Sequence, residues 1–158
     1  MKTRLIITAA FLVSWFGIAD GRAEAVKNGN EACLQFSQAA AAAKTQIQQA
    51  RTGVYHVFRF LKITEIGLPD EKSPFARLLT TEPSSDMRVM LVCGGKISLK
   101  LARELKAGDY VAVRGRVKSV GVEAKDLMVV DPAMLQFKDR STPKAGMELL
   151  SEVDPSAH

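Results

Sequence analysis

Few side chains in this sequence have the types and spacing that catalytic chemistry requires. There are two histidines, His56 and His158, and two cysteines, Cys33 and Cys93. A metal site usually needs three or four clustered His, Cys, Asp or Glu ligands, and no segment has that spacing. A catalytic nucleophile needs a base beside it, and no motif joins a Ser or Cys to His56. The sequence therefore predicts no catalytic residue, no metal site and no cofactor, and His56 is interpreted as an ordinary strand residue.

One glycine pair partly resembles the sequence of a phosphate-binding loop. The stretch Cys93-Gly94-Gly95-Lys96 precedes a predicted helix. It lacks the spacing Gly-(x)4-Gly-Lys-Ser/Thr that places backbone N–H groups around phosphates. We interpret it as a turn whose glycines adopt positive φ.

The clearest chemical pattern is a row of cations in residues 105–120, LKAGDYVAVRGRVKSV. Side chains alternate between the two faces of a strand. The positions expected to face inward are Val111, Val113 and Val117. The positions expected to face outward are Tyr110, Ala112, Arg114, Arg116 and Lys118. The segment therefore predicts a strand with one basic face.

This basic face has two interpretations. Proteins bind single-stranded nucleic acid with a basic groove and with aromatic side chains on which bases stack. An earlier predicted strand would add Arg59 and Lys62, and Tyr55, Tyr110 and Phe58 are the candidate aromatic platforms. The alternative is that these cations are only the solvated side of a barrel. The net charge of +5 permits anionic partners without requiring them, because basic and acidic residues are mixed along the chain.

The first 25 residues read as a secretory signal peptide. Lys2 and Arg4 precede an apolar run of roughly a dozen residues, and Ala23-Glu24-Ala25 fits a small-residue cleavage site. The run is shorter than the roughly 20 residues that a spanning helix needs, although an uncleaved membrane anchor is the alternative. We expect cleavage after Ala25, or else after Ala23, no later transmembrane segment, and a periplasmic or secreted protein.

The two cysteines are expected to form a disulfide. An oxidising compartment favours bonded cysteines when their number is even. A Cys33–Cys93 bridge would close a loop of about 60 residues and stabilise the fold by roughly 4 kcal/mol in the chain-entropy model. The alternative is two separate buried thiols.

Residues 26–52 are expected to hold an Ala-rich helix in front of the main domain. Ala and Gln favour a helix from about residue 31 to residue 51. Asn28 or Asn30 is the expected N-cap, and Gly53 the stop. The segment could instead be a linker or a helix that pairs with another protein.

Residues 53–137 are expected to form the domain, with the order β-β-β-α-β-β. The predicted strands cover about residues 54–67 (a coiled or bulged strand), 75–81, 87–94, 110–120 and 127–130, with an extension at 134–137 beyond Pro132. Pro132 should break the last strand or place it at an edge. A helix at about 98–105 would bury Ile97, Leu101 and Leu105, with Leu99 and Ala102 at the margin. The pattern predicts a mostly β fold, a five-stranded Greek-key OB barrel with its helix between strands three and four. Residues 138–158 read as a flexible tail.

Residues 87–120, MRVMLVCGGKISLKLARELKAGDYVAVRGRVKSV, resemble the tRNA-anti-like OB-fold domains of small bacterial envelope proteins. The matching positions are Leu105, Lys106, Gly108, Val111, Val113, Gly115 and Val117. The resemblance covers about residues 55–137. The first strand departs from the pattern, because FRFLKITEIG replaces the usual Val-x-Gly-x-Val. The resemblance implies an OB fold and, by analogy with the family's name, nucleic-acid binding.

Two functions follow as expectations. The first is a non-catalytic binding or accessory module outside the cytoplasm, with an envelope protein or an oligosaccharide as partner. Its ligand would lie on the face of the first three strands and on the loops at about 69–74 and 120–125. The second is a single-stranded nucleic-acid binder that uses the basic strand face.

Overall fold

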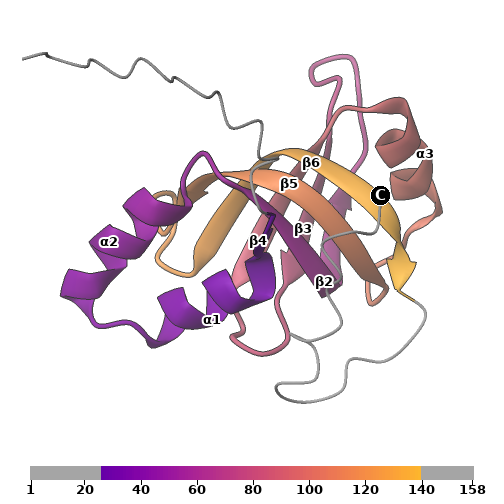
Figure 1. Ribbon diagram of the computed structural model, residues 1–158. Helices are drawn as coiled ribbons and strands as arrows, with labels where there is room; N and C mark the ends of the chain where they lie inside the picture. The colour runs from indigo at the N-terminus through magenta and orange to yellow at the C-terminus, as the bar shows by residue number, and fades with distance from the viewer. Residues whose placement is uncertain (1–25, 140–158) are drawn as a thin grey trace, which may run out of the picture.

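The computed structural model describes residues 26–139 (Figure 1). The predicted signal peptide and residues 140–158 of the predicted tail lie outside the described residues. No helix in the described part is long and apolar enough to cross a membrane.

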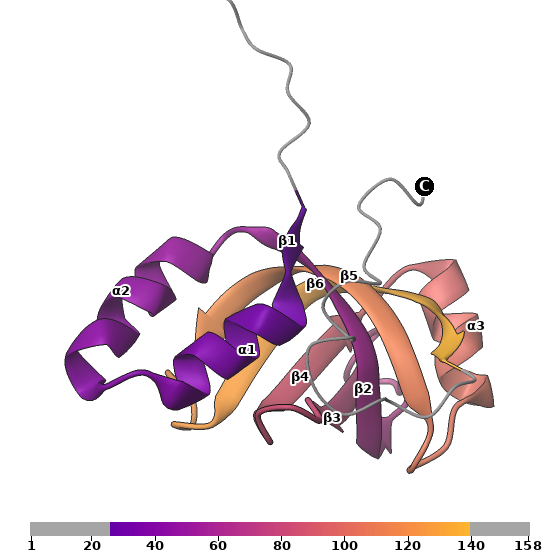
Figure 2. The same ribbon diagram turned by 60° about the horizontal axis from the view of Figure 1, so that its bottom comes forward.

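Five long strands form a closed barrel (Figures 1 and 2). They are β2 (Tyr55–Gly67), β3 (Ala76–Thr81), β4 (Arg88–Cys93), β5 (Tyr110–Val120) and β6 (Leu127–Asp139). The sheet order is β1-β2-β3-β4-β6-β5, and an additional β2–β5 pairing closes it. The short strand β1 (Lys27–Asn28) pairs in parallel with β2 and was not predicted. The predicted OB-fold-like barrel is confirmed, with helix α3 (Lys96–Glu104) between its third and fourth strands.

The inward valines of β5 lie in the core as predicted. Val111, Val113 and Val117 have no exposed surface. Gly115, which follows Val113 on the same face, lets β6 come close: a Cβ there would lie 2.3 Å from Cγ1 of Val130 and 2.8 Å from the carbonyl oxygen of Pro132. The predicted central strand, β4, pairs with β3 on one side and with β6 on the other.

Strand β2 contains the bulge that its length suggested. Its register with β5 moves from Phe58↔Val113 to Leu61↔Val111, so Arg59 and Phe60 together face a single residue. Phe60 has φ +55°, which is uncommon for a residue other than glycine. The backbone N–H of Phe60 donates to Oδ2 of Asp139 at 2.9 Å, and this bond supports the unusual conformation.

The N-terminal segment forms two helices, so the prediction of one helix was wrong. α1 (Gly29–Gln38) and α2 (Ala41–Arg51) are separated by extended backbone at Ala39 and Ala40. α1 packs on the barrel through Ala32, Cys33 and Phe36, whereas α2 buries no residue. The break at Ala39 and Ala40 lets the chain turn back toward the start of β2. Just before β2, the N–H of Gly53 donates to the carbonyl of Val117 on the barrel. Tertiary packing therefore outweighs the helix propensity of alanine. Asn28 caps α1, as one of the two predicted alternatives.

α3 packs on the barrel through Leu105, with Leu99 and Leu101 partly buried against the core, as predicted, but the prediction for Ile97 was wrong. Ile97 is 79% exposed, and the buried residues of the helix are Ser98 and Ala102, followed by Leu105. Small side chains let the helix approach β6 closely, and Oγ of Ser98 accepts a hydrogen bond from the N–H of Leu135 at 3.0 Å. The glycine prediction before α3 was also wrong: Gly95 has φ −75°, and neither Gly94 nor Gly95 has positive φ.

The expected Cys33–Cys93 disulfide is absent, and both thiols are free and buried. Cys33 lies near Glu82, in the turn before β4, whereas Cys93 ends β4. Six residues of strand place the two ends of β4 about 16 Å apart. Bridged cysteines need a Cα separation below about 7 Å, so this fold keeps the two residues apart.

Strand β6 runs without a break from Leu127 to Asp139, beyond the predicted limits. It pairs with β4 only as far as Val130, and with β5 along its whole length. Pro132 therefore lies where β6 leaves β4, at an edge, which is the second of its two predicted placements. Lys138 and Asp139, assigned to the tail by the sequence, are strand residues.

Candidate functional site

The structure brings together four of the seven predicted binding residues. Tyr55 lies opposite Arg116, and Val57 lies opposite Arg114, on the paired strands β2 and β5. Lys118 follows on the same outward face of β5 and is exposed. Lys62 and Tyr110 pair with each other beyond the β2 bulge, at the other end of the two strands.

Arg114 is the unusual member of this basic face. It is half-buried, and its Nε is fully buried without a hydrogen-bond partner among the described residues. Lys118 forms an exposed ion pair with Asp131 at 3.4 Å. A shallow hollow of about 310 Å3 lies beside Arg116, Lys118 and Pro132. The exposed Arg116 and Lys118 line this hollow and can meet an anion there, and Tyr55 lies beside Arg116.

Arg59 has a structural role instead. Its Nη2 and Nε donate to Oδ1 of Asp139 at 2.9 and 3.3 Å. Its guanidinium lies 4.9 Å from the ring centre of Phe60 and 5.2 Å from that of Phe137. Because Asp139 also binds the N–H of Phe60, one carboxylate holds both residues of the bulge.

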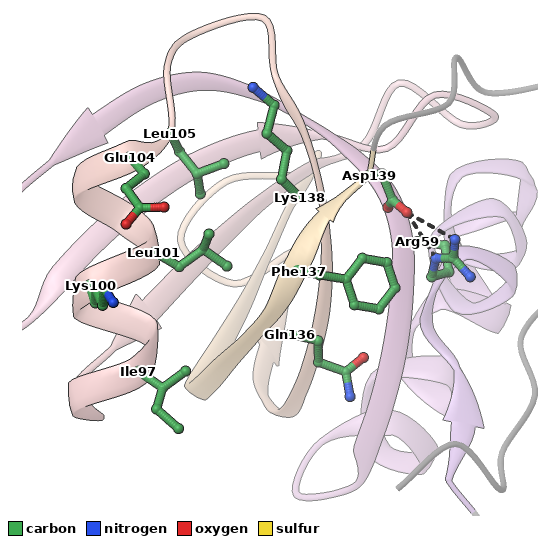
Figure 3. A pocket seen from close by; sticks show the side chains of 10 residues that line it. All are labelled: Arg59, Ile97, Lys100, Leu101, Glu104, Leu105, Gln136, Phe137, Lys138 and Asp139. Carbon is green, nitrogen blue, oxygen red and sulfur yellow. Dashed lines mark hydrogen bonds and ion pairs between the residues drawn. The ribbon is translucent and has the colours of Figure 1, made fainter.

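A larger groove lies at the end of the barrel beside Arg59 (Figure 3). Its volume is about 820 Å3. Helix α3 forms one wall and the end of β6 the other, and Figure 3 shows Leu101 and Leu105 pointing from the helix toward the strand. The lining residues are Arg59, Ile97, Lys100, Leu101, Glu104, Leu105, Gln136, Phe137, Lys138 and Asp139. Phe137 is 47% exposed, so the groove is open and partly apolar.

Sequence reasoning placed the ligand elsewhere, on the face of β2, β3 and β4. There the half-buried Leu79 and Met90 lie opposite each other on β3 and β4. The groove was missed because it depends on which face α3 turns outward and on β6 continuing past Pro132. The sequence gives no signal for it, because Ile97 shares the four-residue spacing of Leu101 and Leu105 and was expected to be buried with them.

A buried hydrogen-bond network, which the sequence analysis did not predict, holds Arg59 in place beside the groove. The amide of Asn30 accepts from the N–H of Arg59 at 2.8 Å and donates to Arg59 O and to Oε1 of Glu82, both at 2.9 Å. Glu82 is fully buried, and its carboxylate also accepts from Ser84 and Ser85. These bonds satisfy a carboxylate that would otherwise be costly to bury. The network ties α1 to the β2 bulge, and through it to Arg59.

Burial favours the neutral forms of His56, Cys33 and Cys93. Burial lowers the pKa of His56, and its Nδ1 lies 3.0 Å from the carbonyl of Val54. Burial raises the pKa of Cys93 to about 12 and that of Cys33 well above its usual value. The thiols are therefore protonated at neutral pH and poor nucleophiles. No group of three or more His, Cys, Asp or Glu within residues 26–139 could hold a metal ion.

Comparison with known proteins finds neither a matching family model nor a matching curated protein.

Proposed function

We propose that this chain is a non-catalytic, OB-fold-like binding module that works outside the bacterial cytoplasm and holds a partner in the groove between α3 and β6. One observation carries the proposal. Two large apolar side chains, Ile97 and Phe137, are exposed around a hollow of about 820 Å3. Concave sites lined by apolar side chains with a few polar groups are the usual form of binding sites.

The location outside the cytoplasm is supported by residues 1–25. Their charged start, apolar run and Ala-x-Ala site have the features of a secretory leader. The resemblance of residues 55–137 to tRNA-anti-like envelope domains agrees with that location. Intact-mass measurement of the exported protein should give a chain that begins at Val26, and a chain that retains Met1 would contradict export with cleavage.

The binding role is tested by site-specific photo-cross-linking in cells that produce the protein. A photoreactive amino acid replaces Ile97 in the groove or, as a control, Val122, which is similarly exposed at 71% in the β5–β6 loop. We expect a discrete adduct from position 97 that weakens with Lys100→Glu, and none from position 122. The absence of an adduct at 97, or the same adducts from both positions, would contradict the proposal.

A second candidate function, binding of single-stranded nucleic acid, is favoured by the basic face. Tyr55 lies beside Arg116, and Nε of Arg114 is buried without an acceptor among the described residues. Aromatic and cationic side chains side by side suit stacked bases and phosphates.

Fluorescence anisotropy tests this second function. The exported protein is titrated into labelled single-stranded DNA and RNA at two salt concentrations. Binding that weakens steeply with salt and is lost in Arg114→Ala/Arg116→Ala supports it. Lys125→Ala, in the β5–β6 loop, is the matched charge control. Absence of binding at low salt would leave the face as the solvated side of the barrel.

A further inference from the structure

We infer that the groove takes an extended segment of a partner polypeptide, which adds as a short strand to the free edge of β6 and carries apolar and acidic side chains. This inference rests on the proposed function, because it names the class of partner that the groove holds. Three features of the groove support it: a strand edge that no strand within residues 26–139 covers, apolar walls, and a cation, Lys100, on α3.

The strand edge comes first. β4 covers one edge of β6 only as far as Val130, while β5 continues to pair with the other edge as far as Asp139. On the edge that β4 does not cover, the N–H of Leu135 donates a hydrogen bond to Oγ of Ser98. From Gln136 onward, this edge lies along the groove. An uncovered strand edge presents unpaired backbone donors and acceptors to which an extended peptide can bond.

The dimensions suit a short strand. Gln136 to Asp139 is four residues, about 13 Å of strand. α3 has nine residues and is about 13 Å long. Each wall is therefore long enough for about four residues of extended peptide.

The walls then select the side chains of the peptide. Leu101 and Leu105 point from α3 toward β6, and Ile97 is exposed beside them (Figure 3). Successive side chains of a strand point in opposite directions. A bound strand would thus place alternate residues against this apolar wall, and those residues should be apolar.

The charged residues that line the groove determine which side chains suit the remaining positions of the peptide. The groove is lined by three cations, Arg59, Lys100 and Lys138, and by two acids, Glu104 and Asp139. Arg59 pairs with Asp139 and Lys138 with Asp109, so Lys100 is the cation of the lining that has no ion pair among the described residues. Complementary charge favours Asp and Glu at the other positions of the peptide. An oligosaccharide would not continue the backbone hydrogen-bond ladder of a strand edge, and we therefore favour a polypeptide.

The test is selection from a library of random eight-residue peptides displayed on phage, against the exported full chain. The expected binders alternate apolar residues with Asp or Glu. Ile97→Asp and Lys100→Glu should each weaken their binding at least about tenfold. Val122→Asp, an equally mild change at an exposed site away from α3, should leave the affinity within about twofold.

Two further measurements test strand addition itself. N-methylation of alternate peptide amides, which removes backbone donors, should abolish binding. Peptide binding should slow amide hydrogen exchange at residues 136–138. Binders that tolerate N-methylation, that are rich in Lys or Arg, or that bind Ile97→Asp as well as the parent chain would overturn the inference, as would the absence of any groove-dependent binder. A cross-link from position 97 to a partner would still support the proposed function in each of those cases.

Discussion

At the scale of single residues, the buried His56 should make the stability of the fold depend on pH, although it has no part in the proposed function. His56 has no exposed surface, and its Nε2 lacks a hydrogen-bond partner among the described residues. Burial lowers its pKa, with smaller effects from Arg51 and Lys27. A base whose pKa is lower in the folded state stabilises the fold above its unfolded pKa of 6.5, and loses that contribution as the pH falls below 6.5.

We therefore predict that the midpoint of thermal unfolding falls between pH 7.5 and pH 5.5. His56→Asn keeps an amide near the Val54 carbonyl and removes the titration, so it should reduce this fall. Asp109 and Asp126 titrate well below this window, because their ion pairs lower their pKa from 3.8. Equal falls in both proteins, measured by circular dichroism, would show that His56 is not the responsible group.

Asp139 gives a second prediction at this scale. Its buried carboxylate binds Arg59 and the N–H of Phe60, and so holds the bulge that shapes one side of the groove. Asp139→Asn loses a charged acceptor and should lower the free energy of unfolding by about 2 kcal/mol in urea titration. Asp126→Asn is the matched control, because its ion pair with Arg88 is exposed and should contribute nothing measurable. Equal effects of the two substitutions would contradict the structural role of Asp139.

At the scale of elements, local patterns predict strands well and packing faces poorly. The alternation in residues 110–120 identified β5 and its inward valines, because a half-buried strand must alternate. On α3 the same reading identified Leu101 and Leu105 but not the exposed Ile97 or the buried Ser98. Ser98 is buried because the N–H of Leu135 needs an acceptor, and that need exists only once β6 is in place. The basic face was thus predicted with its strand, whereas the groove, which depends on α3 and the end of β6, was not.

The close approach of β5 and β6 gives a prediction for a single element. A Cβ at Gly115 would lie 2.3 Å from Val130 and 2.8 Å from backbone oxygen, so Gly115→Ala must shift β6. We expect a loss of about 2–3 kcal/mol in the free energy of unfolding. Gly67→Ala is the control, since its Cβ would meet nothing closer than 3.5 Å, and it should change stability by less than about 0.5 kcal/mol. A similar loss for both would show that the close contact of Gly115 with β6 is not the cause.

At the scale of the whole molecule, the barrel determines the state of the two cysteines. An even number of cysteines in an oxidising compartment favours a bridge, but composition cannot tell how far apart a fold places them. α1 attaches near the start of β4 through the Asn30–Glu82 bond, and carries Cys33 with it. Cys93 lies at the other end of the same strand. The barrel would have to open before the two sulfur atoms could meet.

Because the two cysteines lie apart, we predict that the exported protein carries two free thiols that react slowly in the native state. Alkylation in denaturant should modify both Cys33 and Cys93 without prior reduction, whereas the native protein should react slowly, because both thiols are buried and their pKa values are raised. The unfolding midpoint should also be unchanged by a reducing agent, since no bridge contributes to stability. Mass spectrometry that finds a 33–93 cross-linked peptide, together with a lower midpoint after reduction, would show that α1 reaches the opposite end of the barrel. A stable barrel with two free thiols would instead mean that the buried residues of α1 and the Asn30–Glu82 hydrogen bond hold this helix in place without a covalent link.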